Sequence, residues 1–308
     1  MAGIFPKRIG LSGVVLLLAF AWSVQGQVRL RTSSAYNQIT VEDTGGYRLL
    51  RFNGSMETRM WLPNPLFGHF EYTEYFQMPL LFNPKPQQML LMGLGGGSMV
   101  RAFQHYYPDI HLDTVELDPK VAQVAKQFFH VKETAKHKIH FSDGRQFLRL
   151  NKTRKYDAIL MDAYTSNQFG THIPFHLATK EFFALASEDL TKEGVLVFNV
   201  IGTYDDWRSD IVGSMYQTLK SVFPHVYHFQ ASDTRNIVML AVKSKEPLTS
   251  TTLKNKVAAL RAARPKLPKS FGPRVACIRA QAPKSAANAG VLTDDFAPPG
   301  GLLKSKKR

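Results

Sequence analysis

Glycine occupies four of the five positions from 93 to 97, in the stretch LLMGLGGGSMV (90–100), directly after an apolar run. Bare backbone at the end of a buried strand allows a tight turn and lets a ligand approach the main chain closely. If a helix follows, its free N–H groups favour an anionic or polar ligand. We therefore treat Gly93, Gly95 and Gly97 as candidate ligand-binding residues. An ordinary structural turn is the alternative interpretation.

Three acidic residues follow at the predicted ends of the next strands: Glu116 in TVELDP, Asp143 in SDGRQFL and Asp162 in AILMDAY. An acid about 20 residues after a glycine turn can take both hydroxyls of a ribose in a bidentate hydrogen bond. A carboxylate at Asp143 can accept from an adenine amino group, and Asp162 would lie at the floor of the same crevice. Each acid alone is also typical of a helix N-cap. Together with the glycine turn they indicate a site for an adenosine-type nucleoside.

These residues need a frame that brings strand ends together. From residue 88 onward, apolar runs alternate with amphipathic stretches, which is typical of βαβ units and a parallel sheet covered by helices on both faces. In such a sheet, ligands bind at the carboxyl ends of the strands. We predict strands at QMLLMGL, IHLDTVEL, KIHFSD, YDAILMDA and GVLVFNVIG, a closing pair HVYHFQA and NIVMLAVKS, and helices at GSMVRAFQHYY, PKVAQVAKQFF, GRQFLRLN, TKEFFALASEDL and SDIVGSMYQTLKSVF.

A smaller unit precedes this frame. The segments NQITVED, YRLLRFNG and METRMWL are separated by Asn, Gly and Asp, which is typical of a β-meander. The stretch FEYTEYFQMPLLFN (70–83) predicts a helix with an aromatic face, and the prolines at 84 and 86 end it. We divide the chain into an N-terminal segment 1–26, a small β-domain 27–84, a Rossmann-like nucleoside-binding domain 85–245, and a C-terminal helix and loop segment 246–308 with a basic tail.

The first 26 residues have the pattern of an export signal. Lys7 and Arg8 precede IGLSGVVLLLAFAWSV (9–24), and Gly26 is a plausible end of a cleavage site. A spanning helix needs about 20 apolar residues, so a cleaved signal peptide is favoured over a permanent anchor. The protein is then exported, periplasmic in a bacterium, or held at a membrane through 9–24. A cytoplasmic location is the third possibility.

Composition limits the class of protein. The chain has 308 residues, 44% hydrophobic, which is enough for a sizeable core. The single cysteine, Cys277, excludes an internal disulfide framework and a multi-cysteine metal site. The histidines lack metal-ligand spacing, so no metal is expected. The net charge of +15 favours acidic partners, but aromatic and basic residues do not interleave, so we expect no nucleic-acid partner.

The order and spacing of these motifs resemble those of spermidine synthases, the polyamine aminopropyltransferases. The likeness rests on the glycine turn, VELDP, SDGRQFL and YDAILMDA, and it extends over roughly residues 33–300. Downstream, IPFHLATKEFF and LTDDFAPPG look like a divergent bacterial branch of that family. The resemblance implies an α/β fold: the Rossmann-like sheet of class I S-adenosylmethionine-dependent methyltransferases, with helices on both faces, preceded by a small N-terminal β-domain.

The resemblance also implies chemistry. S-adenosylmethionine or its decarboxylated form would be a co-substrate, with no bound prosthetic group and an acceptor that the sequence does not identify. Such enzymes often form homodimers. The residues implied on the acceptor side are Asp162, Tyr72 and Tyr164. The residues implied for the nucleoside donor are Gly93, Gly95, Gly97, Glu116, Asp143, Gly144 and Asn37.

The chain departs from the family pattern at the amine end of the site. Gly96 stands where the family has an acid facing the aminopropyl group, and Thr165 stands at the position of the general base. Alignment to the divergent branch places Asn167 there instead. Three further departures lie upstream: Thr73 for the His of the Tyr-His-Glu motif, Glu57 for a Gln, and Asn37 for the Gln of the Tyr36 pair.

These departures matter because a primary amine is protonated at neutral pH and must lose a proton before it attacks. A base replaced by Thr or Asn would cost roughly 10²–10⁴-fold in rate. His176 is one candidate substitute. Candidates for a compensating acidic pocket are Glu57, Glu71, Glu74, Asp294 and Asp295, although residues 293–295 are also typical of a turn or helix cap.

Three functions therefore stay open. The first is a spermidine synthase-like transferase with a changed acceptor or a relocated base. The second is a methyltransferase that uses intact S-adenosylmethionine, which the loss of the acid at Gly96 favours. The third is a non-catalytic binding protein on this fold, which an exported location favours.

Overall fold

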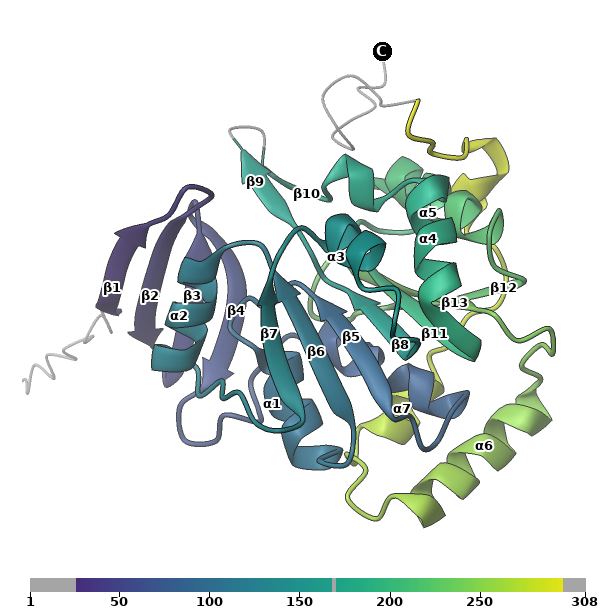
Figure 1. Cartoon of the computed structure of the whole chain (residues 1–308), viewed down its shortest axis with the longest axis horizontal. Coiled ribbons are helices and arrows are strands. Elements are labelled where there is room, and N and C mark those ends of the chain that lie inside the picture. Colours follow the sequence, from purple (N-terminus) through teal and green to yellow (C-terminus); the bar gives the residue numbers. More distant parts are fainter. Residues whose placement is uncertain (1–25, 168–169, 296–308) are drawn as a thin grey trace, which may run out of the picture.

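The computed structural model describes residues 26–167 and 170–295. It contains a large seven-stranded sheet, a four-stranded sheet and a two-stranded hairpin (Figure 1). The export or anchor segment predicted over 1–26 and the basic tail lie almost wholly outside the described residues. Within them, no helix is both long and apolar enough to cross a membrane.

The large sheet confirms the predicted fold class. All its neighbouring strands run parallel except around one strand near an edge, which is antiparallel to both of its neighbours. The predicted closing pair therefore forms the end of this same sheet. In spatial order the strands are β12 (His225–Gln230), β13 (Asn236–Val242), β11 (Leu190–Ile201), β8 (Tyr156–Met161), β5 (Gln88–Met92), β6 (His111–Glu116) and β7 (His137–Phe141).

Helices cover both faces of this sheet, which explains why its strands are apolar runs rather than alternating patterns. Along β5, Leu90 and Met92 pack into one core, and Met89 and Leu91 pack into another on the opposite face. The first core is closed by α3 (Gly144–Leu150), α4 (Lys180–Asp189) and α5 (Ser209–Lys220), and the second by α1 (Ser98–Tyr106), α6 (Ser250–Ala263) and α7 (Phe271–Val275).

The small sheet is an antiparallel meander that α2 (Pro119–Phe128) fixes against the large sheet (Figure 1). Val121 and Val124 of α2 pack on the small sheet, whereas Ala122 and Ala125 belong to a core of the large one. This shared helix sets the distance between the two sheets and thus the size of the space between them. The meander consists of β1 (Gln27–Ser33), β2 (Gln38–Thr44), β3 (Tyr47–Phe52) and β4 (Ser55–Trp61).

Three details differ from the sequence predictions. The strand β1 was missed, because it is an edge strand whose residues are mostly exposed and polar. The segment predicted as a helix over 70–83 is a 3₁₀-helix, η1 (Glu71–Leu81), in which every residue from Tyr75 onward is buried. Pro79 has no N–H with which to form an α-helical hydrogen bond. The burial of residues 75–81 also means that tertiary packing, more than helical propensity, determines the backbone conformation of this segment.

The third difference is a pair of short antiparallel strands that the sequence analysis did not predict, β9 (Thr165–Asn167) and β10 (Gly170–His172). The hairpin is followed by a short 3₁₀-helix, η2 (Phe175–Leu177). At the C-terminal end, η3 (Lys284–Asn288) packs against α5.

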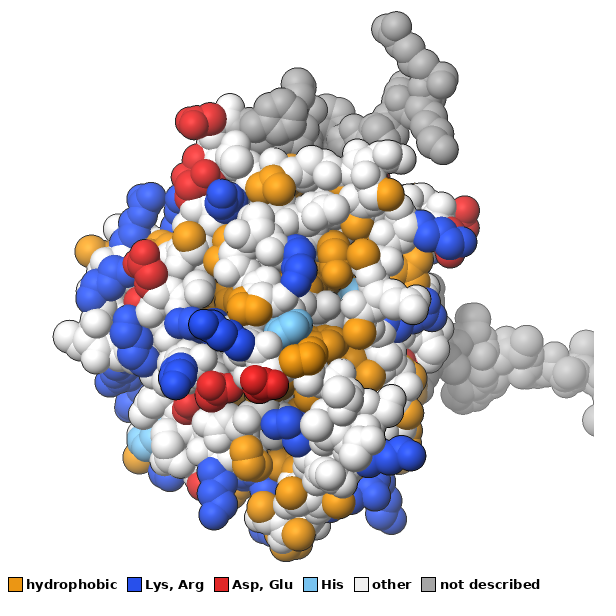
Figure 2. Space-filling model, turned by 90° about the vertical axis from the view of Figure 1, so that its right-hand side faces the viewer, with side chains coloured by type: hydrophobic (Ala, Val, Ile, Leu, Met, Phe, Trp, Pro, Cys, Tyr) orange, Lys and Arg blue, Asp and Glu red, His pale blue; other side chains and the backbone are white. Residues whose placement is uncertain are grey.

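The surface is basic but mixed. Figure 2 shows one face of the molecule, on which Lys and Arg side chains are interspersed with acidic, neutral and apolar side chains. On this face, the net charge of +15 is therefore not gathered into one basic stripe.

Candidate functional site

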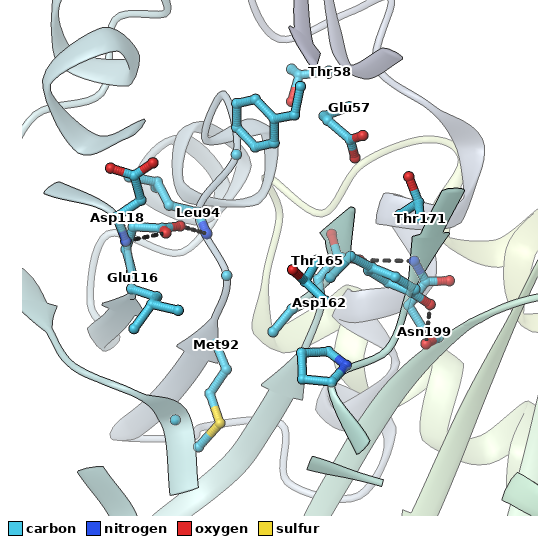
Figure 3. Close-up of a pocket in the computed structure, with 18 of the residues that line it drawn as sticks. Glu57, Thr58, Met92, Leu94, Glu116, Asp118, Asp162, Thr165, Thr171 and Asn199 are labelled. Carbon is cyan, nitrogen blue, oxygen red and sulfur yellow. Dashed lines mark hydrogen bonds between the residues drawn. The ribbon is translucent and has the colours of Figure 1, made fainter. Parts of the chain in front are cut away.

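A cavity of about 440 Å³ lies at the carboxyl ends of β5, β6, β7, β8 and β11. The strand β5 stands between β6 and β8, which follow it in opposite directions across the sheet. Such a reversal of strand order is where open α/β sheets bind ligands. Residues of β3 and β4 in the small sheet, together with Phe70 and Tyr72, line the cavity from the other side. The site is therefore formed by both sheets (Figure 3).

The glycine turn connects β5 to α1 and touches the next strand end. Gly93 has φ +93°, and a Cβ there would lie 2.3 Å from the Asp162 carbonyl oxygen. Only glycine fits this approach. Gly93 and Gly95 line the cavity. Gly97 does not line the cavity. A Cβ at Gly97 would lie 2.2 Å from Val131, so glycine is required there for packing.

Glu116 ends β6 and faces the cavity beside this turn. Its two carboxylate oxygens accept from the backbone N–H groups of Leu94 (3.0 Å) and Asp118 (2.9 Å) (Figure 3). Burial raises the pKa of the Glu116 carboxyl, and the backbone hydrogen bonds oppose that rise. The acid is thus held in one orientation, with further lone pairs available for a ligand.

A second acid beside Glu116 was missed by the sequence analysis. Asp118 caps α2 through the N–H of Lys120, and its other oxygen accepts from the Ser34 hydroxyl at 2.5 Å. The amide of Asn37 lies 3.5 Å from that same oxygen. This network attaches the predicted donor residue Asn37 to the large sheet. The signal was present in VELDP, where the second acid precedes a proline that starts a helix.

Asp143 and Gly144 lie at the end of β7 and line the cavity. Asp143 caps α3 by accepting from the N–H of Gln146 at 3.0 Å, and its other oxygen lies 2.6 Å from His176 Nε2. Burial alone would raise the pKa of Asp143, but the hydrogen bond with His176 and the backbone hydrogen bonds of Gln146 and Arg145 together outweigh it, and the pKa is lowered. His176 therefore pairs with a residue of the predicted nucleoside side, which argues against it as the base for the acceptor.

Asp162 ends β8 and is held by neighbours on two sides. The Tyr72 hydroxyl donates to Oδ2 at 3.1 Å. The Asn199 amide donates to Oδ1 at 2.8 Å (Figure 3). Asn199 is in turn fixed by Asn236, which donates to its Oδ1 at 3.0 Å, and by Tyr164, whose hydroxyl donates to its carbonyl at 2.6 Å. Burial raises the pKa of Asp162 to about 6, against these hydrogen bonds.

The predicted residues Asp162, Tyr72 and Tyr164 thus come together, and Asn199 and Asn236 join them. Sequence reasoning missed both asparagines. The signal for Asn199 is a polar residue in the middle of the apolar strand GVLVFNVIG, and it lies buried there. A buried polar side chain needs partners, and the partners of the Asn199 side chain are Asp162 and Asn236.

The strand β4 contributes two neighbouring side chains, Glu57 and Thr58, to the lining of the cavity. Thr58 accepts from the N–H of Gly96 at 2.9 Å, which ties the small sheet to the glycine turn. Glu57 points into the cavity, toward the region of Asp162, Thr165 and Thr171 (Figure 3). At the two positions considered for a family-type base, Thr165 lines the cavity with a hydroxyl, and the side chain of Asn167 is not among those described.

Several acids considered for the acceptor pocket are used elsewhere. Glu74 accepts from Arg274 at 2.6 Å and lies 3.3 Å from His69, and Glu71 lies 3.3 Å from Arg274. Burial would raise the pKa of Glu74, but these two partners lower it to about 2. Likewise, Asp294 forms a bidentate pair with Arg145, and neither it, Asp295, Glu71 nor Glu74 lines the cavity.

The chain is similar in sequence to known proteins. The family model described as "Spermine/spermidine synthase domain" matches residues 69–252. A polyamine aminopropyltransferase from Vibrio vulnificus (strain CMCP6) is 32% identical over 254 residues, which cover 78% of this chain and 82% of that protein.

Solved structures give the same fold. A probable spermidine synthase from Corynebacterium glutamicum ATCC 13032 has a TM-score of 0.67 at 20% identity, over 87% of this chain and 97% of that one. Human methyltransferase-like protein 13 in complex with SAH has a TM-score of 0.56 at 26% identity, over 62% of this chain and 91% of that one.

Proposed function

The chain belongs to the spermine/spermidine synthase family, and from this premise we propose that it transfers an aminopropyl group from decarboxylated S-adenosylmethionine to an amine. The observation that supports this most is that one cavity contains both a set of residues suited to the nucleoside donor and a carboxylate suited to the amine acceptor. At one end lie the glycine turn and Glu116, and at the other lies the buried carboxylate of Asp162, oriented by Tyr72 and Asn199.

The nucleoside end suits an adenosine-type donor. Glu116 would accept from both ribose hydroxyls, with the backbone of Gly93 and Gly95 close to the sugar and the sulfur. Asp143 would accept from the adenine amino group beside Gly144, and Asn37 would close this end from the small sheet. Each of these residues lines the cavity.

The other end suits the reaction. The acceptor nitrogen attacks the carbon beside the sulfonium, the new C–N bond forms, and the electrons of the broken C–S bond return to sulfur, which leaves 5′-methylthioadenosine. Positive charge leaves the sulfur and develops on the attacking nitrogen. A preoriented carboxylate at Asp162 stabilises that charge, because it needs no reorganisation during the reaction, and Tyr72 holds it in place. Positioning of the two reactants supplies much of the remaining rate.

The test is turnover by the full-length chain with decarboxylated S-adenosylmethionine and a panel of primary monoamines and diamines. We expect 5′-methylthioadenosine and an aminopropylated amine to appear in equal amounts. Mass spectrometry of both products measures this. Formation of S-adenosylhomocysteine and a methylated amine from intact S-adenosylmethionine, with no aminopropyl product from the decarboxylated donor, would overturn the proposal.

Methyl transfer is the second candidate, and one observation favours it. A side chain at Gly96 would meet Thr58, since a Cβ there would lie 2.7 Å from Thr58 Cγ2. The glycine turn therefore holds no acid for the amino group of the decarboxylated donor. Human methyltransferase-like protein 13, which was solved with SAH, also shares 26% identity with this chain.

Replacing Glu116 by glutamine tests the nucleoside end. The amide NH₂ of Glu116→Gln would face one of the two backbone N–H groups that the carboxylate now accepts from. Hydrogen bonds to a charged group are worth about 1.5–3 kcal/mol, so we expect affinity for 5′-methylthioadenosine to fall by about 10–100-fold. Titration calorimetry measures it, with Glu193→Gln, an exposed change on β11, as the control. Equal affinity of the two variants would contradict the assignment of Glu116.

A further inference from the structure

Five carboxylates line the cavity among the residues that the structure describes, and one of them differs from the rest. The other four have both oxygens engaged with backbone or side-chain partners. In Glu57, Oε1 is buried and has no hydrogen-bond partner. The four engaged carboxylates are Glu116, Asp118, Asp143 and Asp162.

Glu57 lies at the acceptor end. It projects from β4 toward the region of Asp162 (Figure 3). Among the described residues, no Lys, Arg or His forms an ion pair with it; Arg59, two positions along the same strand, pairs with Asp233 instead. A buried carboxylate without a cation is costly. The position is therefore suited to a ligand that brings a positive charge.

The electrostatic setting supports the same conclusion. Burial raises the pKa of Glu57, a hydrogen bond from Ser55 opposes that rise, and the charge of Asp162 raises the pKa further. A general base works best when its pKa lies near the working pH. A carboxyl whose pKa is raised is thus a better proton acceptor at neutral pH than an exposed one.

The reaction requires such a group. Thr165, which follows β8 and lines the cavity, has a hydroxyl that cannot take a proton from an ammonium. Each carboxylate oxygen of Asp162 already accepts a hydrogen bond, one from Tyr72 and one from Asn199. Asp162 is therefore suited to stabilise a positive charge at a fixed position rather than to accept a proton. Glu57 has the free oxygen.

We propose that Glu57 is the general base for the acceptor amine, an assignment that rests on the proposed aminopropyl transfer. Its free oxygen accepts one proton from the bound ammonium. The freed nitrogen lone pair then forms the C–N bond, and the C–S electron pair returns to sulfur. The secondary ammonium product keeps the positive charge, and Glu57 returns its proton to solvent.

The test compares full-length wild type with Glu57→Gln, which has nearly the same shape and removes only the charge. At pH 7.5 we expect kcat to fall by at least about 100-fold. The remaining rate should rise about tenfold per pH unit up to about pH 9, because only amine that binds already deprotonated can react. Affinity for 5′-methylthioadenosine should not change. Glu42→Gln, an acid on β2 that pairs with Arg51 outside the cavity, should match wild type.

A second variant tests whether a carboxylate is what the site lacks. Adding Thr165→Asp to Glu57→Gln restores a proton acceptor from the opposite wall, and we expect it to recover at least about tenfold of the lost rate at pH 7.5. An active wild type with Glu57→Gln within threefold of it, or with a loss that is the same at every pH, would overturn the role of Glu57 alone. A wild type that aminopropylates no amine would overturn the proposed function itself.

Discussion

Replacing Asp162 by asparagine is expected to lower kcat/KM for the acceptor amine by about 10³–10⁴-fold, near the upper end of what one charged group contributes in such reactions. The change keeps the shape of the side chain but removes the charge that balances the developing ammonium. The new amide can keep both orienting contacts, because its Oδ1 still accepts from Asn199 and its NH₂ can donate to the Tyr72 hydroxyl oxygen, so the loss reports mainly the missing charge. Affinity for 5′-methylthioadenosine should stay within about threefold, because Asp162 lies at the acceptor end.

The pH dependence gives this prediction a second measurement. Burial raises the pKa of Asp162 to about 6. Its ionised form is therefore present above pH 6 and is lost as the pH falls through that value, so wild-type kcat/KM should fall below about pH 6. In Asp162→Asn the limb that comes from Asp162 should disappear, and the limb that remains, from Glu57, should lie at lower pH, because the charge of Asp162 no longer raises the pKa of Glu57. The exposed change Asp206→Asn is the control. An acid limb that stays in place in Asp162→Asn would contradict the assignment.

Much of the frame of this site is readable from the sequence for a physical reason. Strands buried on both faces are continuous apolar runs, and the residue that ends each run lies at one edge of a parallel sheet. Gly93, Glu116, Asp143 and Asp162 could thus be assigned to one crevice without knowledge of any side-chain contact. The fold follows from local pattern plus a topological rule.

What the sequence does not show are contacts between residues far apart along the chain. Glu74 and Arg274 are 200 positions apart. Nothing in the local sequence indicates that Glu74 forms an ion pair with this arginine instead of lining the cavity. That Glu57 Oε1 has no hydrogen-bond partner cannot be predicted from the sequence either, because it depends on which side chains the fold places near it. Edge strands such as β1 are missed for a related reason: they bury little, so their pattern has no clear period.

Replacing Gly93 by alanine is expected to destabilise the protein by about 4 kcal/mol. Two effects add at this position. A backbone at φ +93° costs an L-residue about 1–3 kcal/mol. The added methyl group would lie 2.3 Å from the Asp162 carbonyl oxygen, and the backbone shifts that relieve this clash cost about another 1–3 kcal/mol. Urea unfolding measures the change as a shift in midpoint at constant slope.

Gly54 provides a matched control for the first of these effects. It has φ +87° in the turn between β3 and β4, and a Cβ there would meet nothing within 4 Å. Gly54→Ala therefore carries the backbone strain without the clash, and it should cost only about 1–2 kcal/mol. The difference between the two variants isolates the contact between the glycine turn and the end of β8.

That contact joins the two ends of the cavity, which is why Gly93→Ala should impair more than stability. The backbone shift that relieves the clash must move either the glycine turn, which faces the donor, or residue 162, which faces the acceptor. Folded Gly93→Ala protein, assayed well below its unfolding midpoint, should thus lose at least about tenfold in kcat/KM, since small displacements of reacting groups have large costs in rate. Equal destabilisation by the two alanine variants, with full activity of folded Gly93→Ala, would show that the turn and Asp162 are not coupled in this way.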